Sequence, residues 1–338
     1  NLRFKSEFGY DDYRYNTDRY YGPSTYYVRN TPSSTNQGKP AVTLTRQSRS
    51  TIRNTNTVNY DFKKLIKDEK HHLNALIGQE YVIAKNNKIT NTSHGFPSTF
   101  TADDCINLMT QGTPFEITNY SDPNDVLLSY FGRLNYDYDS KYLFSGTFRA
   151  DGSSRFGVNN RWGYFPSVSA GWTISNEPFL KDALENIATV RIRASWGKSG
   201  NNDIGNYSSI AGISTGSYAF GTTAVSTSRL GGFADSELGW ETTTQTNIGL
   251  DLGFFNSRLN VIANYYNSIS TDILYNAPIS AISGFTSSTT NMTDAKIRNR
   301  GFDLQIDARL LTGKVKWNVS TNISINRNKV VNLGGLDD

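Results

Sequence analysis

The residue types that most often carry chemistry are scarce in this chain. Its 338 residues include three histidines, His71, His72 and His94, and one cysteine, Cys105. A Ser-His-Asp triad needs a histidine close to a nucleophile and an acid, and no nucleophile motif accompanies these histidines. One cysteine cannot form an internal disulfide, and the His and Cys spacing does not match a structural zinc site. We therefore expect no enzyme, no metal site and no cofactor.

Polar side chains, many of them charged, instead recur at every second position in several segments of the chain. In the segment 296–310, Phe302 and Leu304 alternate with Asp303 and Gln305. Such a period of two predicts a β-strand with one apolar and one polar face. Residues on the polar rows of several such segments include Arg133, Asp137, Arg149, Arg191, Arg193, Asp251, Asp303, Asp307 and Arg309.

The same pattern predicts about eleven strands along the chain. A sheet built from them cannot be covered by protein on both faces, because one face is strongly polar. The predicted strands lie near residues 2–10, 51–65, 72–85, 127–138, 141–151, 162–174, 190–199, 241–254, 258–274, 296–310 and 314–328.

Long and short connections between these strands take turns. Outer-membrane β-barrels have long outside loops and short periplasmic turns, so the rhythm indicates an antiparallel up-and-down transmembrane β-barrel. An Arg on the lipid face would cost ~2–4 kcal/mol near the midplane, so the charged rows are expected to face the lumen or a plug. We expect long connections near 11–50, 86–126, 152–161, 200–240 and 275–295, and short ones near 66–71, 139–140, 175–189, 255–257 and 311–313.

Composition narrows the class of protein further. Aromatic residues make up 13% of the chain and charged residues only 19%, below the ~25% of soluble proteins. The net charge is +4 with dispersed basic residues, which argues against nucleic-acid binding. The chain contains no run of ~18 apolar residues, so a helical membrane span is not expected. The amino end lacks a signal-peptide pattern, so we expect that a signal was removed or that the chain is a piece.

An ordered series of short motifs resembles one protein family. The series covers about residues 127–335, and the likeness is thinner over residues 1–126. The chain resembles the SusC/RagA family of TonB-dependent outer-membrane transporters from Bacteroidetes. The motifs are Arg149-Ala-Asp-Gly-Ser-Ser-Arg-Phe156, Arg161-Trp-Gly-Tyr-Phe-Pro-Ser167, Gly171-Trp-Thr-Ile-Ser-Asn-Glu177, Trp196-Gly-Lys-Ser-Gly-Asn-Asn-Asp-Ile-Gly-Asn-Tyr207, Leu238-Gly-Trp-Glu-Thr242, Thr244-Gln-Thr-Asn-Ile-Gly-Leu-Asp251, Tyr265-Tyr-Asn267, Ile297-Arg-Asn-Arg-Gly-Phe-Asp303 and Asn326-Arg-Asn-Lys-Val330.

The resemblance implies more than the residues themselves indicate. It implies a barrel of 22 strands in the bacterial outer membrane, an amino-terminal plug and a TonB box that couples to the energy machinery of the inner membrane. It also implies a SusD-like surface lipoprotein that captures glycans or peptides. On this interpretation the chain is the middle of a longer barrel, with the plug before Asn1 and the last strands after Asp338. The protein then does no covalent chemistry.

Polar residues in the expected outside loops are candidates for contact with substrate or lid. Each also has a structural interpretation, as a turn former, an ion-pair partner or an interface anchor. For the 151–155 run we favour the structural interpretation. Only Asp203 is charged in the 200–203 run, which makes a calcium site there a weak interpretation. The candidates are Asp151, Arg155, Asn201, Asn202, Asp203, Tyr207, Trp240 and Glu241.

Two other classes of protein stay open at this stage. A secreted or surface β-rich adhesin would pack its apolar faces against each other in a sandwich or solenoid. A passive porin would share the barrel but lack a plug. Loops that recognise glycans and loops that recognise peptides use the same Tyr, Trp, Asn and Asp residues, so the sequence does not name the substrate.

Overall fold

The computed structural model describes residues 2–30, 35–66, 68–121, 124–181, 187–220 and 223–335. Its main element is a sheet of 12 strands, eleven of which follow one another along a single path. From β5 to β16 each neighbouring pair on the path is antiparallel. The path consists of β1 (Leu2–Tyr21), β2 (Ala41–Asp61), β3 (His71–His94), β5 (Asp125–Tyr138), β6 (Tyr142–Ser153), β7 (Trp162–Thr173), β8 (Ile187–Asn201), β11 (Glu241–Phe254), β12 (Leu259–Thr271), β15 (Lys296–Thr312) and β16 (Lys316–Asn332).

The remaining elements lie in the connections. β4 (Thr113–Ser121) pairs with β3, β9 (Ile213–Phe220) with β10 (Thr223–Leu230), and β13 (Ile273–Pro278) with β14 (Ser287–Met292). None of the helices in the described residues is long and apolar enough to cross a membrane. The helical turns are α1 (Tyr26–Arg29), η1 (Phe62–Lys64), α2 (Ala102–Asn107), η2 (Met109–Gln111), η3 (Ile174–Asn176), α3 (Pro178–Lys181) and η4 (Ala281–Ser283).

The first three strands are longer than predicted. β1 continues to Tyr21 instead of ending at residue 10, β2 begins at Ala41 instead of residue 51, and β3 continues to His94. The connections expected over 11–50 and 86–126 are shorter by these extensions. The extra segments carry polar side chains on both faces, as at Asp11 and Asp12, so the contrast between alternate positions that marks a strand fades there.

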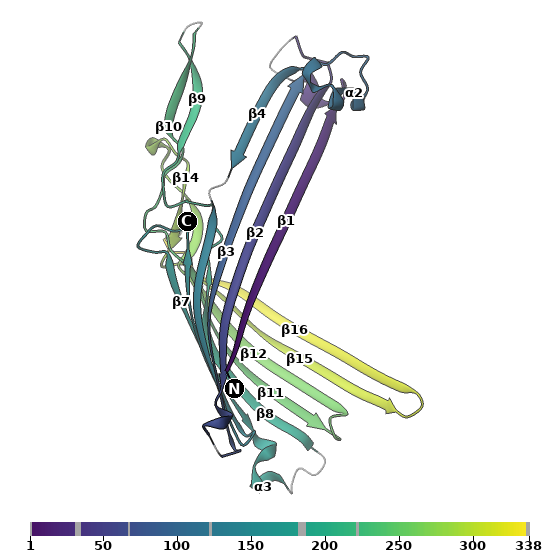
Figure 1. Cartoon of the computed structure of the whole chain (residues 1–338), viewed down its shortest axis with the longest axis vertical. Helices are drawn as coiled ribbons and strands as arrows, with labels where there is room; N and C mark the ends of the chain where they lie inside the picture. Colours follow the sequence, from purple (N-terminus) through teal and green to yellow (C-terminus); the bar gives the residue numbers. More distant parts are fainter. Residues whose placement is uncertain are drawn as a thin grey trace. The chain divides into compact units, whose positions relative to one another are not determined.

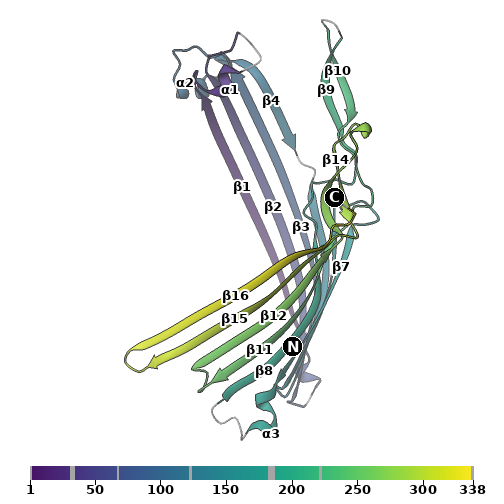
Figure 2. The ribbon, with the colours of Figure 1, turned by 180° about the vertical axis from the view of Figure 1, so that it is seen from behind.

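Two other expected loops contain strands. The connection over 200–240 holds the β9–β10 hairpin, which projects away from the strand ends in Figures 1 and 2. The connection over 275–295 overlaps the β13–β14 hairpin. Ser and Thr are frequent in both hairpins, so no continuous apolar row identifies them from sequence. The connection at 152–161 lies between β6 and β7 and contains only the last two residues of β6.

The short connections have tight turn geometry. Asp139 and Ser140 adopt φ angles of 53° and 55°, as a two-residue hairpin turn requires. The Asp137 carboxylate accepts a hydrogen bond of 2.7 Å from the Ser140 backbone amide. At 255–257 all three residues have positive φ. The connection at 311–313 follows the end of β15, and η3 and α3 occupy the start of the connection at 175–189, of which 182–186 lie outside the described residues, as does residue 67 of the connection at 66–71.

The chain divides into two compact units. Unit 1 comprises Asn1–Ser6, Thr55–Glu80 and Leu127–Asp338, and unit 2 comprises Glu7–Asn54 and Tyr81–Val126. Unit 2 has a small core of its own, in which Val42, Phe96 and Cys105 are fully buried. The helix α2 in this unit begins with a capping box formed by Thr101 and Asp104. The core and the cap give the connection between β3 and β4 a defined structure.

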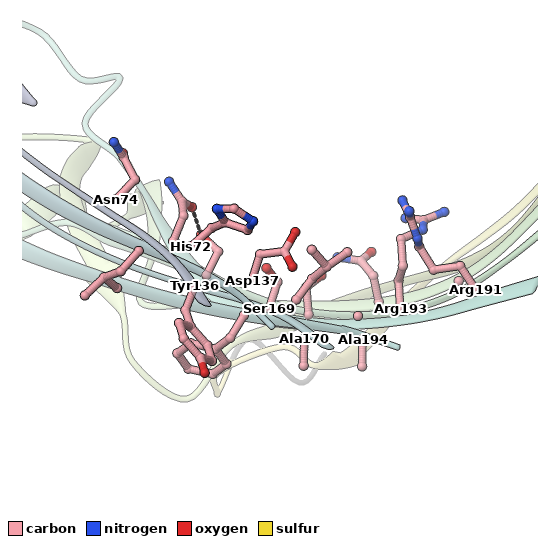
Figure 3. Close-up of a pocket in the computed structure, with 18 of the residues that line it drawn as sticks. His72, Asn74, Tyr136, Asp137, Ser169, Ala170, Arg191, Arg193 and Ala194 are labelled. Carbon is pink, nitrogen blue, oxygen red and sulfur yellow. Dashed lines mark hydrogen bonds between the residues drawn. The ribbon is translucent and has the colours of Figure 1, made fainter. Parts of the chain in front are cut away.

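The sheet of unit 1 has one polar and one apolar face. In Figure 3 His72, Asn74, Asp137, Ser169, Arg191 and Arg193 rise from the concave face, whereas Tyr136, Ala170 and Ala194 point the other way. On the opposite, convex face Phe144, Phe148 and Ile323 are 48%, 52% and 53% exposed. These apolar rows are not buried in a second protein layer, as a sandwich would require.

Aromatic rings gather at both ends of the convex face. Near the short connections, Tyr142 stacks with Tyr138 and Trp172 at centroid distances of 6.2 and 6.5 Å. Near the long connections, the ring of Tyr130 stacks with that of Trp162, and the ring of Phe148 with that of Tyr164. Two aromatic bands that flank an apolar belt are typical of a transmembrane β-barrel.

Candidate functional site

The concave face of unit 1 contains a hollow of about 540 Å³. Asp61 at the end of β2, η1, and strands β3, β5, β6, β7, β8, β11 and β12 line it, because alternate residues of each strand point to this side. The polar lining residues include His72, Asn74, Asn135, Asp137, Ser145, Ser169, Arg191, Arg193, Asn247 and Asn264 (Figure 3). Hydrogen-bonding groups thus cover a wall about seven strands wide, as contact with water, a polar ligand or a plug requires.

Arg193 is fixed by a bidentate ion pair on this wall. Its Nε and Nη2 donate to the two Asp251 carboxylate oxygens at 2.8 and 2.6 Å, and Nη2 also donates to Asn264 Oδ1 at 3.0 Å. Gly249 leaves the space for the guanidinium, since a Cβ there would lie 2.9 Å from Nη2. The ion pair and the bond to Asn264 join β8 to β11 and β12, so Arg193 has a structural role in the wall in addition to any contact with a ligand.

Arg191 differs from its neighbour Arg193 in its partners. Its Nε donates to Thr173 Oγ1 at 3.1 Å, and the described residues provide no carboxylate within ion-pair distance. The side chain still points into the hollow (Figure 3). Asp251 lies directly opposite Arg191 in the strand register but forms its ion pair with Arg193, so the Arg191 guanidinium remains available to a partner on the concave side.

Arg149 occupies the concave face nearer the long connections. Its Nε donates to an Asp151 oxygen at 2.7 Å, and its Nη2 donates to Glu80 Oε1 at 3.1 Å. Its guanidinium carbon lies 5.3 Å from the centre of the Phe131 ring. Gly78 accommodates that ring, because a Cβ would lie 2.4 Å from Phe131 Cζ. Arg149 and the buried Asp151 are thus paired within the wall.

The other predicted lumen residues also have neighbours on the wall. Arg133 Nε donates to Thr147 Oγ1 at 3.1 Å, Ser324 donates to Asp303, and Ser320 donates to Asp307 at 2.5 Å. Arg309 lies on the same face by alternation, next to a bulge between Arg309 and Leu311. All the predicted polar rows of β5 to β15 thus occupy one face of the sheet.

Two motifs far apart in sequence meet at the long-connection end. Arg155 Nη1 donates to the Asn202 carbonyl oxygen at 3.0 Å and lies 3.5 Å from the Asp203 carboxylate. Asn202 Nδ2 donates to Ser153 Oγ at 3.0 Å. Asp203 is 91% exposed, so its carboxylate stays accessible. The contacts favour the interpretation of turn formation and pairing for the buried members of this cluster.

Trp240 forms the second part of the same loop cluster. Its ring lies 5.4 Å from that of Phe156 and 5.3 Å from that of Phe165, and its Nε1 donates to the Arg161 carbonyl oxygen at 2.9 Å. A Cβ at Gly200 would lie only 2.1 Å from Phe165 Cζ. Trp240 therefore links the connection at 152–161 and the start of β7 to the end of the connection at 200–240, which favours its interpretation as an anchor.

Glu241 and Asn201 join the base of these loops. Asn201 Nδ2 donates to Glu241 Oε1 at 3.5 Å, and the Leu274 backbone amide donates to Glu241 Oε2 at 3.1 Å. Tyr207 lies farther along the loop with a φ of 58°, a left-handed conformation. The structure therefore brings six of the eight loop candidates into contact with each other or with neighbouring connections, whereas Asp151 pairs with Arg149 within β6 and Tyr207 is not among the contacts of this cluster.

Sequence reasoning missed two residues that hold this architecture together. Asn291 donates to the carbonyl oxygens of Gly239 and Asp272 and accepts from the Gly239 amide, and no sequence pattern distinguishes it from the many other Asn residues. Glu177 accepts from Tyr142 Oη at 2.7 Å and from Trp172 Nε1 at 3.0 Å. Glu177 ends the motif that runs from Gly171 to Glu177, and this position is the sequence signal that could have identified it.

The geometry contains no metal centre in the described part of the chain. No group of three or more His, Cys, Asp or Glu side chains there could hold a metal ion.

The fold and the two-faced wall agree with comparisons to known proteins. Residues 1–336 match the family described as TonB dependent receptor-like, beta-barrel, and the chain belongs to this family of outer-membrane barrels. The predicted antiparallel barrel fold is thereby confirmed, and no plug domain is evident among the described residues.

Particular relatives place the chain more narrowly. It is 39% identical over 229 residues to the TonB-dependent receptor SusC of Bacteroides thetaiotaomicron, covering 66% of this chain and 22% of SusC. It is 39% identical over 232 residues to the TonB-dependent receptor P39 of Formosa agariphila, covering 68% and 21%. The structure of the RagAB peptide transporter matches with a TM-score of 0.83 and 28% identity, over 98% of this chain and 35% of that one. The predicted SusC/RagA-like membership is confirmed.

The chain covers only part of the length of the proteins that it matches. It spans about a fifth of the length of these curated relatives and about a third of the RagAB chain.

Proposed function

We propose that this chain forms part of the wall of an outer-membrane active transporter. The observation that carries the proposal is the division of one curved sheet into an exposed apolar face and a concave polar face with a hollow of about 540 Å³. An apolar convex face suits lipid, and a polar concave face suits a water-filled or plugged lumen. Several charged groups of the wall pair with each other, as Arg193 does with Asp251 and Arg149 with Asp151, which suits a structural wall and not covalent chemistry.

The cargo that we propose is an oligomeric nutrient, an oligosaccharide or a peptide. Support comes from the similarity to SusC and to a structure described as a peptide transporter. The loop cluster keeps the Asp203 carboxylate exposed above a framework held by Trp240, and such a group can accept hydrogen bonds from sugar hydroxyls or peptide amides. A SusD-like surface lipoprotein acts as the lid over these loops.

Energy for the transport step is proposed to reach the barrel through a plug and TonB. Arg191 offers the plug a guanidinium that forms no ion pair within the described wall. A carboxylate on the plug would complete an ion pair there, and its loss on plug movement would open the hollow.

Uptake by cells is the test of this function. A strain that relies on the full-length transporter should lose uptake of its labelled nutrient at trace concentration when the TonB system is deleted. Continued uptake without TonB would contradict active transport and favour a passive pore. A variant truncated in the loop cluster should lose binding of nutrient and lid while its barrel still assembles.

A further inference from the structure

Four cations form a patch on the convex, apolar face of β15 and β16. Arg298 and Arg300 continue the outward row that contains Phe302, and Arg327 and Lys329 continue the outward row of Ile325. The register places Arg298 directly opposite Lys329 and Arg300 directly opposite Arg327. A hollow of about 320 Å³ lies among these four side chains and Asn328. We call these four residues the outer cationic patch.

The patch lacks acidic partners in the part of the chain that the structure describes. No ion pair involves any of its members there, and the outward positions of β11, β12, β15 and β16 include no Asp or Glu. Like charges directly opposite each other on neighbouring strands destabilise a sheet. An anion bound between these two adjacent pairs would relieve the repulsion among their four positive charges.

The register also fixes the height of the patch relative to the apolar belt. Ile248, Tyr265, Phe302 and Ile325 form one row across the four strands, and beyond this row the outward positions are mainly polar or cationic. On β16 the outward residues from Trp317 to Ile325 span nine residues, the length of a tilted strand that crosses the hydrocarbon core (~9–11 residues). The row with Ile325 thus marks the end of the belt on the long-connection side.

The first row of the patch lies two residues beyond that boundary. Two residues of a tilted strand add about 5 Å of height. The headgroup layer is about 5–7 Å thick on each side of the hydrocarbon, so Arg300 and Arg327 lie at the level of headgroups. At this level the anions within reach of outward cations are the phosphate groups of surrounding lipid.

We propose that the outer cationic patch binds the phosphate groups of a phosphorylated lipid in the leaflet on the long-connection side. Arg side chains donate fork-like hydrogen bonds to phosphate oxygens, and Lys329 adds a point charge. The acyl chains of the lipid then lie along the row of Phe302 and Ile325, whose side chains are 41% and 56% exposed. This inference rests on the membrane placement in the proposed function but concerns lipid and not nutrient.

The test compares two double variants of the same strand region in the full-length transporter. R327Q/K329Q removes two charges from the patch, and K314Q/K316Q removes two charges at the opposite end, from the turn before β16 and from its first residue. Each protein is placed in phosphatidylcholine nanodiscs doped with phosphorylated lipid A, and native mass spectrometry counts the retained lipid A. R327Q/K329Q should weaken retention by roughly thirtyfold, whereas K314Q/K316Q should retain lipid A like the unchanged protein.

Further arms separate the sources of phosphate and the causes of failure. Free inorganic phosphate at the same concentration should not replace lipid A, and replacement by phosphate alone would overturn the lipid proposal. R298K/R300K/R327K keeps the charges and should keep most of the retention. Equal retention by R327Q/K329Q and the unchanged protein would overturn the proposal, including the case in which carboxylates elsewhere in the full protein neutralise the patch. Because this experiment measures bound lipid, it can confirm or contradict the lipid proposal even if the protein fails to take up nutrient.

Discussion

At the scale of single residues, Trp240 is the side chain that joins the connections at 152–161 and 200–240. Trp240→Ala removes its ring contacts with Phe156 and Phe165, and because the ring is only half-buried we expect a loss of about 2 kcal/mol of local stability. Hydrogen exchange should show faster exchange at 155–163 and 236–240, with unchanged β5 and β6. Trp240→Phe should lie in between, since it keeps a ring but loses the Nε1 donor. Unchanged exchange in Trp240→Ala would contradict the anchoring role.

Gly200 offers a second test of the loop cluster. A Cβ at Gly200 would lie 2.1 Å from Phe165 Cζ, so Gly200→Ala should destabilise the assembled barrel by about 1–3 kcal/mol. Gly212→Ala is the matched control, because nothing lies within 4 Å of a Cβ there. Thermal unfolding in detergent measures both variants. Equal unfolding temperatures for the two variants would show that Phe165 does not pack as described.

Glu177 gives the short-connection end a pH dependence. Hydrogen bonds from Tyr142 and then Trp172 lower the pKa of the Glu177 carboxyl below its ordinary value. A lowered folded-state pKa means that the carboxylate stabilises the turn above the pKa of the unfolded state, and that this stability is lost as pH falls through the folded-state pKa. Hydrogen exchange of the residues around η3 should therefore speed up on acidification, and Glu177→Gln should remove this pH dependence. A pH response that persists in Glu177→Gln would assign it to another group.

Residue types and spacing anticipated which residues share the polar face of the sheet but not the detailed roles of the loop residues. Arg149 and Arg193 lie on the polar face as predicted, because alternation along a strand fixes the side of each residue. Whether Trp240 stacks on a sugar or anchors a loop depends on Phe156 and Phe165, which lie 84 and 75 positions earlier in the chain. Contacts over such separations depend on the fold and cannot be derived from a local pattern.

At the scale of elements, the ion pair between Arg193 and Asp251 couples β8 to β11. Asp251→Asn leaves the Arg193 charge without its carboxylate, whereas Arg193→Gln/Asp251→Asn removes both charges. A double-mutant cycle of unfolding free energies should give a coupling of about 1 kcal/mol, since the pair is partly exposed. Arg133→Gln with Asp251→Asn serves as the control and should show no coupling, because Arg133 lies on β5, several strands away from β11. Additive effects for Arg193 and Asp251 would show that the pair does not stabilise the strand contact.

Strands could be predicted from sequence only where the two faces meet different surroundings. The core of β15 has apolar residues on one side and Asp303 and Asp307 on the other, and the prediction found it. The end of β1 and the β9–β10 hairpin have water on both sides, so no contrast between alternate residues distinguishes them from a loop. Their strand pairing is set by backbone hydrogen bonds to a neighbour, which a single sequence does not display.

At the scale of the whole molecule, a transporter wall requires that the convex face of the sheet meets lipid. Alternation on β16 separates Trp317, Val319, Ile323 and Ile325 from the polar residues between them, and all are exposed in the structure. Accessibility of the individual positions in a bilayer therefore tests the barrel more directly than uptake does, because uptake also depends on plug, lid and energy supply.

Spin labels introduced one at a time at positions 317–325 provide that measurement, in a background with Cys105 replaced by Ala. For the full-length protein in lipid bilayers, labels at odd positions should be accessible to oxygen dissolved in the hydrocarbon, and labels at even positions to a water-soluble nickel complex or shielded by a plug. A period of two with this phase is the predicted result. Uniform accessibility along the strand, or the opposite phase, would contradict a lipid-facing convex wall and with it the transporter.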